Sequence, residues 1–193
     1  MNLGNLDFNI GGINPSGIGA TIYRIAKSAI LSWPTIVNDP SAEEGAASSL
    51  ATYDGNFSLA TGAHWDKLYS TQGKGKITFE VTGEVDCKMY TNHASLSFPD
   101  LTAEALAFCK AAANGDFVFI VKAAGRFHVI GSPDYRAVLS PSGDSGDAAG
   151  SAKGVTFDVE CPDVTPLPIY EGTLLLSDGT LNCATGAFTP SGS

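Results

Sequence analysis

The chain is poor in charged residues and has no long apolar run, and each shortage excludes a class of protein. Lys, Arg, Asp and Glu make up only 16% of its 193 residues, too few for a disordered chain or a coiled coil. No apolar stretch approaches the roughly 20 residues that a membrane-spanning helix needs. Apolar residues nevertheless reach 44% and glycine occupies 22 positions, so the composition predicts a turn-rich globular protein with a sizeable core.

Positive charge is especially scarce. Eleven Lys and Arg residues stand against twenty Asp and Glu residues, which gives a formal net charge of −9. The cations are scattered singly, and Lys74 and Lys76 come nearest to a pair. Because nucleic acids and anionic membranes are bound largely through clustered positive charge, tight binding to either is not expected. An acidic surface could instead keep DNA from sticking to a wall along which it slides.

Motifs that would indicate a metal site or export are also missing. Four cysteines are present: Cys87, Cys109, Cys161 and Cys183. None has the CxxC or CxxH spacing of a zinc site, and the three histidines stand alone in the sequence. The segment Met1–Leu6 has neither the charged nor the apolar region of an export signal. We therefore expect four reduced, buried cysteines in a protein made in the cytoplasm, with no metal or other cofactor.

Alternation of apolar and polar residues predicts about ten strands, mostly joined as hairpins. The clearest signal runs from Lys76 to Pro99, where Thr82-Gly83 predicts a tight turn into a long strand over Glu84–Phe98. Ala124-Gly125 and Asp178-Gly179 predict two further hairpins. The other expected strands are 20–26, 29–37, 57–59, 65–70, 116–123, 126–132, 135–139, 154–161, 173–177 and 180–183.

One helix is predicted, over Leu101–Ala113. Asp100 or Thr102 can cap its beginning, and Asn114-Gly115 can end it. Its expected apolar stripe consists of Ala105, Leu106, Cys109, Ala112 and Ala113. The predicted fold is thus mainly β, an antiparallel β-sandwich or barrel of about ten strands with one flanking α-helix (101–113). Residues 1–19 should form an extended arm, and 20–193 a single domain with a flexible, Ser/Gly/Asp-rich loop at 140–153.

The string Gly143-Asp144-Ser145-Gly146 has the letters that surround the nucleophile of chymotrypsin-like proteases. A triad would require His64 as base and Asp86 or Asp100 to orient it. Asp147 would then place a negative charge where the reaction itself develops one, and the segment reads as mobile. A polar loop is the favoured interpretation, and no enzymatic activity is expected.

The order of elements over Asp116–Gly172 resembles that of phage and prophage tail-tube proteins. A strand ending in Phe127-His128-Val129-Ile130-Gly131-Ser132 is followed by Tyr135–Leu139 and a Ser/Gly/Asp loop. A "KG" strand then starts at Lys153-Gly154, and Pro168–Gly172 follows it. The resemblance covers under a third of the chain.

The resemblance implies a structural virion protein, made in the bacterial host cytoplasm. Such subunits form hexameric rings that stack into a tube, whose acidic lumen conducts DNA without binding it specifically. Other tail or virion proteins would be its partners, and no membrane is involved. The expected lumen-facing residues are Glu80, Glu84 and Asp86. The expected inter-subunit residues are Leu3, Leu6, Phe8, Asp144 and Asp147. The alternative is a binding module, such as a capsid decoration or carbohydrate-binding domain with an exposed aromatic cluster on one sheet face.

Overall fold

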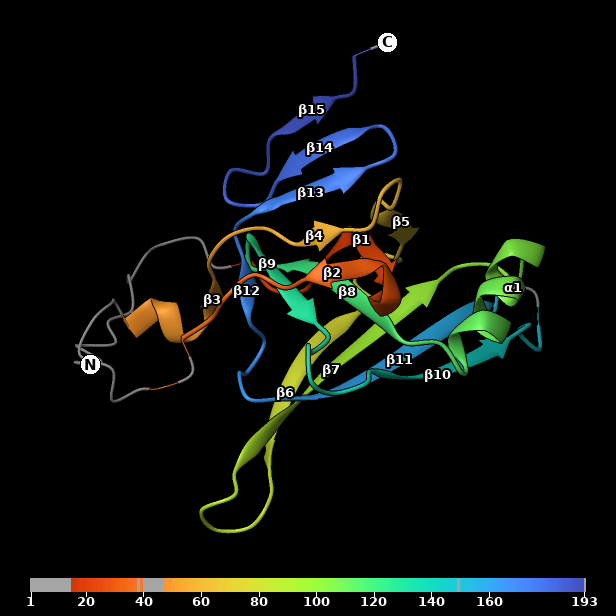
Figure 1. The fold of residues 1–193 in the computed structure, drawn as a ribbon. Coiled ribbons are helices and arrows are strands. Elements are labelled where there is room, and N and C mark those ends of the chain that lie inside the picture. The colour runs from red at the N-terminus through yellow and green to blue at the C-terminus, as the bar shows by residue number, and fades with distance from the viewer. Residues whose placement is uncertain (1–14, 38, 40–46, 149, 193) are drawn as a thin grey trace.

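The computed structural model describes residues 15–37, 39, 47–148 and 150–192, and folds them into β-sheets with a single α-helix (Figure 1). The largest sheet has the order β3 (Thr52–Tyr53), β12 (Ile169–Tyr170), β9 (Arg126–Ile130), β8 (Phe117–Ala123), β1 (Ile18–Ala26) and β5 (Asp66–Tyr69). The second has the order β10 (Val138–Asp144), β11 (Gly154–Asp163), β7 (Met89–Phe98) and β6 (Lys76–Thr82). Two small sheets contain β13 (Thr173–Leu176), β14 (Gly179–Asn182) and β15 (Phe188–Pro190), and β2 (Ile30–Ser32) and β4 (Ser58–Leu59).

The predicted fold class is confirmed. Strand pairing is antiparallel apart from β12 with β3 and the isolated bridge between Trp65 and Leu176. Fifteen short strands in the described residues take the place of the ten or so that alternation predicted. The helices are α1 (Ala103–Ala112) and the 3-10 turns η1 (Lys27–Ala29) and η2 (Ala47–Leu50). None of these helices has the length and apolar content needed to cross a membrane.

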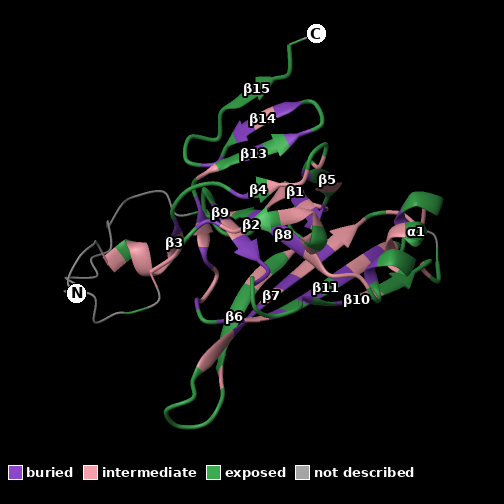
Figure 2. Cartoon of the chain, in the orientation of Figure 1, coloured by how far each residue is buried: buried purple, intermediate pink, exposed green. Residues whose placement is uncertain are grey.

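The central strands of the six-stranded sheet are mostly buried (Figure 2). Their alternate residues enter two different cores, one on each face of the sheet. Ile22, Phe119 and Val121 point toward the four-stranded sheet and meet Leu96 and Phe157 there. The opposite face belongs to a second core whose members include Trp65, Tyr170, Leu174 and Leu181. The two main sheets therefore form a sandwich. The small sheets cover the face of the six-stranded sheet that points away from the four-stranded sheet.

The hairpin of β6 and β7 extends away from the body of the molecule (Figure 1). The expected strand over Glu84–Phe98 is wrong in its first part, since β7 starts only at Met89. Gly83 and Asp86 have φ values of 97° and 67°, and a strand cannot continue through residues in this left-handed region. Residues 83–88 form a loop, closed by a hydrogen bond from the Lys88 ammonium to the Gly83 carbonyl. Cys87 lies exposed in this loop and Cys109 on α1 is only half-buried, contrary to the expectation of four buried cysteines.

The interpretation of 140–153 as a single loop is wrong for its first five residues. β10 continues to Asp144 and pairs with β11 down to Gly154. Its Ser, Pro and Gly residues are compatible with a strand here because β10 lies at a sheet edge, where Pro141 can turn its nitrogen away from the neighbouring strand. The connecting loop therefore begins at Ser145.

The expected helix forms, but its apolar stripe is partly wrong. Thr102 caps α1 by accepting a hydrogen bond from the Ala105 amide at 3.2 Å. Ala105 and Ala112 are buried as expected, whereas Leu106 and Ala113 are exposed. Phe108 packs on Phe117 and Phe157 instead, with ring centroids 5.5 and 5.1 Å away.

Two strand boundaries also differ from expectation. The arm predicted for 1–19 is wrong at its end, because β1 begins at Ile18, and residues 1–14 lie outside the described residues. The strand expected over 29–37 is reduced to β2, since Pro34 lacks the amide that a strand ladder needs and only Thr35 forms a further bridge, to Asp54.

Candidate functional site

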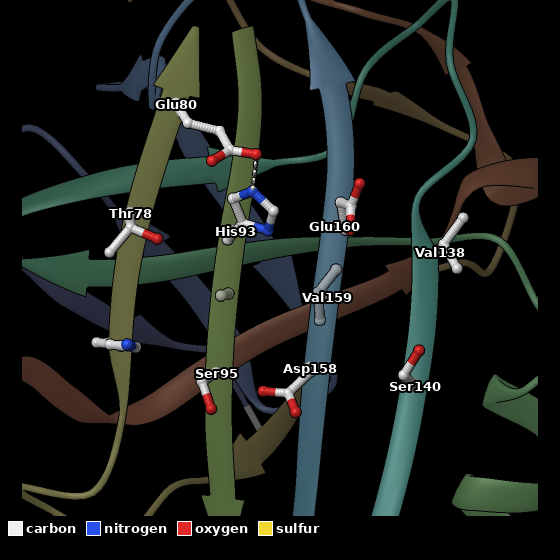
Figure 3. A pocket seen from close by; sticks show the side chains of 11 residues that line it. Thr78, Glu80, His93, Ser95, Val138, Ser140, Asp158, Val159 and Glu160 are labelled. Atoms are coloured by element: carbon white, nitrogen blue, oxygen red, sulfur yellow. Dashed lines mark ion pairs between the residues drawn. The ribbon is translucent and has the colours of Figure 1, made fainter. Parts of the chain in front are cut away.

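The outer face of the four-stranded sheet is the most distinctive surface of the molecule. Alternation along β11 sends Val155, Phe157 and Val159 into the core, so Asp158 and Glu160 point to the opposite side. The same alternation in the neighbouring strands gathers polar side chains around a shallow hollow of about 410 Å³ (Figure 3). Its lining includes Lys76, Thr78, Glu80, His93, Ser95, Val138, Ser140, Asp158 and Glu160.

The hollow is predominantly acidic. Glu80, Asp158 and Glu160 contribute three carboxylates, and Lys76 contributes the one lysine of its lining. His93 projects from β7 between its neighbours: its Nε2 atom lies 3.6 Å from Glu80 Oε1, and it pairs across the strands with Glu160 (Figure 3). Three carboxylates against one lysine give this surface a net negative charge.

A second hollow of about 440 Å³ lies on the same sheet at the end opposite the β6–β7 loop. Its lining includes Lys74, Ser97, Asp144, Lys153 and Thr156. The Lys153 ammonium donates a hydrogen bond to Asp100 Oδ1 at 2.9 Å, and this contact lowers the pKa of Asp100. The polar face is thus acidic at its centre and carries two lysines at this end.

Both edges of the four-stranded sheet are open. β10 pairs only with β11 and β6 only with β7 among the described residues. An open edge presents backbone N–H and C=O groups that can pair with a strand from another chain. Edge and face together make this sheet a candidate assembly surface.

The sequence-predicted residues are only partly brought together. Glu80 lies on the polar face, whereas Glu84 and Asp86 lie in the loop beyond the strands. Asp144 ends β10 and accepts a hydrogen bond from the Gly146 amide at 2.9 Å. Asp147 accepts one from Ser151 Oγ at 2.7 Å, which lowers the pKa of Asp147. Leu3, Leu6 and Phe8 lie outside the described residues.

Sequence reasoning missed Asp158, Glu160 and His93 as members of this face. Their signal was present, because the polar positions of β11 alternate regularly with Val155, Phe157 and Val159. What was lacking was the pairing of β11 with β7, which sets Glu160 beside His93 although 67 positions separate them in the chain.

The protease-like triad does not assemble in the described structure. His64 lies 3.6 Å from Asp66 beside β5, in the six-stranded sheet. Ser145 follows β10 in the other sheet, and its hydroxyl donates to the Gly146 carbonyl. Asp86 lies in the β6–β7 loop, and Asp100 is held by Lys153. The GDSG string is therefore a strand end followed by a turn.

A metal-binding arrangement is likewise not found in the described residues, and the aromatic pair Phe79 and Tyr90 lies on the β6–β7 hairpin outside the polar hollow, with Phe79 51% exposed. No three His, Cys, Asp or Glu side chains gather in a way that could hold a metal ion. His128 on β9 lies apart from His64 and His93, and its Nδ1 atom is 2.9 Å from the Leu167 carbonyl oxygen. No aromatic side chain lines the polar hollow, so this face lacks a platform on which a sugar ring could stack.

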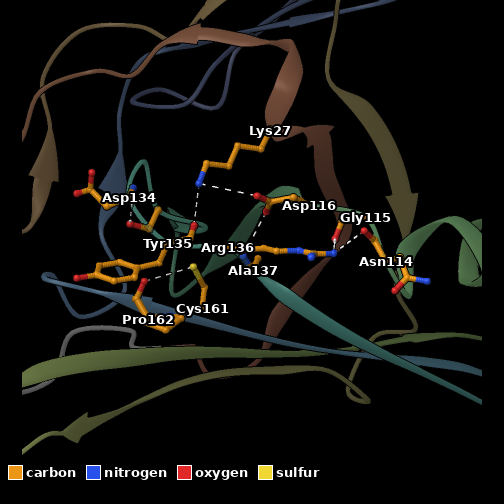
Figure 4. Close-up of polar contacts among 11 residues, drawn as sticks. Lys27, Asn114, Gly115, Asp116, Asp134, Tyr135, Arg136, Ala137, Cys161 and Pro162 are labelled. Carbon is orange, nitrogen blue, oxygen red and sulfur yellow. Dashed lines mark hydrogen bonds and ion pairs between the residues drawn. The ribbon is translucent and has the colours of Figure 1, made fainter.

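A further polar cluster joins the two main sheets (Figure 4). The Lys27 ammonium donates to the Tyr135 carbonyl at 2.8 Å and lies 3.8 Å from Asp116 Oδ2. The other Asp116 oxygen accepts from the Ala137 amide, and Arg136 donates to the carbonyls of Asn114 and Gly115. These contacts anchor the segment between β9 and β10, so the cluster has a structural role.

Comparison of the chain with protein-family models, with curated proteins and with solved structures gave no match in any of the three.

Proposed function

We propose that this chain is the subunit of a self-assembling ring that stacks into a tube of the phage-tail type. One observation carries the proposal: a four-stranded sheet with one face in the core, a polar and acidic opposite face, and two open edges. Open edges of this kind can pair with a strand from another chain. Pairing β10 of one copy with β6 of the next covers both edges at once, except at Pro141, which has no amide to donate.

The strand directions support ring closure. Neighbouring strands in the order β10, β11, β7 and β6 all run antiparallel, so β6 runs opposite to β10. Rotation about a ring axis preserves strand direction, and the β10 strand of the next copy then arrives antiparallel to β6. A continuous antiparallel barrel follows, with four strands from each copy and no remaining edge.

The polar face would then line the lumen. Closing the sheet with its apolar face outward, against the six-stranded sheet, turns Glu80, Asp158 and Glu160 toward the central channel. A negatively charged wall repels the phosphates of DNA and lets the duplex pass without sticking. The hexameric symmetry and the place of the tube in a virion follow from the resemblance to tail-tube proteins.

Electron microscopy of the purified protein, together with its mass from light scattering, tests the assembly. We expect rings or tubes with a central hole, and for a single ring a mass of about six times the 19.9 kDa of the chain. A monomer at every concentration would contradict the proposal and would favour the alternative, a binding module such as a decoration domain.

Cross-linking tests which edges meet. Thr78→Cys on β6 and Ser140→Cys on β10 put thiols on the same polar face, in a Cys87→Ser, Cys109→Ala background that removes the two native thiols that are not buried. A short bis-maleimide, which tolerates a small shift in register, should give a ladder of covalent oligomers up to the ring. Each single-cysteine variant is the matched control and should stop at dimers. A double variant that also stops at dimers would rule out pairing of β6 with β10.

A further inference from the structure

The segment that leads from β11 to β12, residues 163–168, is held in place by side chains rather than by a strand ladder. Two of its residues are prolines, which have no amide to donate. The Val164 and Thr165 amides both donate to Asp163 Oδ1, at 2.7 and 3.3 Å. The Leu167 amide donates to a side chain of β7 at 2.8 Å. The shape of this segment, here called the clasp, therefore depends on two side chains, one of which is a carboxylate.

The clasp connects the two main sheets. From β7 of the four-stranded sheet, the Asn92 side chain accepts from the Leu167 amide and donates to the Thr165 carbonyl at 3.0 Å. From β9 of the six-stranded sheet, His128 Nδ1 lies 2.9 Å from the Leu167 carbonyl oxygen. Asn92 is also the cross-strand partner of Phe79 on β6. The clasp thus joins the β6–β7 hairpin to the other sheet.

Ionised Asp163 is the weak point of the closed clasp. Its side chain is buried, and its Oδ2 atom has no hydrogen-bond partner. A buried charged oxygen without a partner raises the free energy of the folded state, because nothing replaces the water that it loses. Leu167 adds backbone strain, since its φ of 43° lies in the left-handed region that leucine rarely adopts. Opening the clasp would relieve both the buried charge and the strain.

No positive charge balances the Asp163 carboxylate, which forms no ion pair within the described residues. The titratable groups around it are Asp134, before β10, with Tyr53 on β3 and Cys161 on β11. The Lys27 ammonium acts on Cys161, but it is bound to a backbone carbonyl between β9 and β10 (Figure 4). Burial above all, with a contribution from Asp134, raises the pKa of Asp163 to about 6, although its two amide hydrogen bonds oppose the rise.

We propose that residues 163–168 form a proton-dependent clasp, which is closed while Asp163 carries a proton and opens locally when Asp163 releases that proton to solvent. A protonated carboxyl group buries no charge, whereas the carboxylate gains water when the clasp opens. Opening frees Asn92 from the clasp and loosens the connection between the two sheets beside the hairpin, while the cores stay folded. The change takes place within one chain and does not depend on the assembly of copies.

Hydrogen–deuterium exchange, measured by mass spectrometry at pH 5 and pH 8, tests the clasp. Each rate is divided by that of an unfolded peptide at the same pH, which removes the intrinsic pH dependence of exchange. Protection of the clasp amides should fall about tenfold from pH 5 to pH 8, because the pKa of Asp163 is about 6 in the closed state and about 3.9 when exposed. Equal protection at the two pH values would overturn the proposal.

Low concentrations of urea separate local opening from unfolding of the whole molecule. Local opening exposes little surface, so exchange of the clasp should respond only weakly to urea, whereas exchange through global unfolding accelerates steeply. Residues 155–160 of β11 are the internal reference and should be protected more strongly than the clasp. Clasp exchange that matches β11 in both rate and urea dependence would show global unfolding and would overturn the proposal.

Two variants assign the titrating group. Asp163→Asn keeps an oxygen that can accept both amides and removes the charge, so protection of the clasp should no longer depend on pH. Asp134→Asn is the matched control, because it removes an exposed carboxylate near the clasp and leaves Asp163 in place; it should keep most of the fall. A pH dependence that survives in Asp163→Asn would belong to another group, such as His128, and would overturn the proposal. Loss of the dependence in Asp134→Asn would overturn it too.

Discussion

At the scale of single residues, the buried carboxylate of Asp163 should make stability depend on pH. Its side chain is 3% exposed, Oδ1 accepts from the amides of Val164 and Thr165, and Oδ2 has no hydrogen-bond partner. Burial raises the pKa of Asp163 to about 6, above the value of about 3.9 in an unfolded chain. The folded state therefore holds this proton more tightly than the unfolded state. Its contribution to stability is full below about pH 4, falls as the pH rises to about 6, and then stays constant.

Asp163→Asn should remove the loss of stability that the buried carboxylate causes as the pH rises. We expect the free energy of unfolding to rise by about 2–3 kcal/mol at pH 8 and to change little at pH 4, measured by urea denaturation. Asp100→Asn is the control, because the Lys153 hydrogen bond lowers the pKa of Asp100 and its removal should not stabilise the protein at pH 8. An equal gain for Asp163→Asn at both pH values would contradict the burial argument.

Asn92 is a second residue whose role is local. Its fully buried amide group donates to the Thr165 carbonyl at 3.0 Å and accepts from the Leu167 amide at 2.8 Å. Asn92→Ala leaves both backbone groups without these partners, and should lower the free energy of unfolding by about 2–3 kcal/mol. Ser95→Ala, on the outer face of the same strand, should cost less than about 0.5 kcal/mol. Similar losses for the two variants would argue against the bridging role of Asn92.

At the scale of elements, α1 is held by Phe108 rather than by Leu106. Phe108 stacks edge-on against Phe117 and Phe157 and lies under the Arg24 guanidinium at 4.1 Å, whereas Leu106 is 50% exposed. Phe108→Ala should therefore lower the free energy of unfolding by about 2–3 kcal/mol at the midpoint temperature, and Leu106→Ala by under about 0.5 kcal/mol. Calorimetry of the two variants decides between the stripe that the sequence suggested and the one in the structure.

The elements show which features a sequence can predict. Alternation of apolar and polar residues correctly predicted β11 and most of β1. Turn residues correctly predicted the β13–β14 hairpin, although its two-residue turn is Ser177-Asp178 instead of Asp178-Gly179. These signals are local, since they depend on neighbours in the chain. The helix stripe failed because 3.6-residue spacing fits several faces, and only the sheet beneath selects Phe108. The polar face could not be foreseen, because it depends on β11 lying beside β7, a long-range pairing.

At the scale of the whole molecule, the face built from Glu80, Asp158 and Glu160 should set how strongly the proposed tube binds DNA. Glu80→Lys with Glu160→Lys replaces the carboxylates on either side of His93 and leaves the core side of the sheet unchanged. We expect these tubes to bind a short DNA duplex about tenfold more tightly than unaltered tubes at low salt, with the gain lost as salt rises, measured by fluorescence anisotropy.

Asp54→Lys with Glu171→Lys makes the same change in net charge at exposed sites off the polar face. If that face lines the lumen, DNA bound by the first variant lies inside the tube and is protected from a nuclease too large to enter. DNA bound by the second variant lies outside and is digested. Equal digestion would contradict a lumenal position of the face, whereas selective protection would require Glu80 and Glu160 to face the channel, because only an enclosed wall can both bind and shield the duplex.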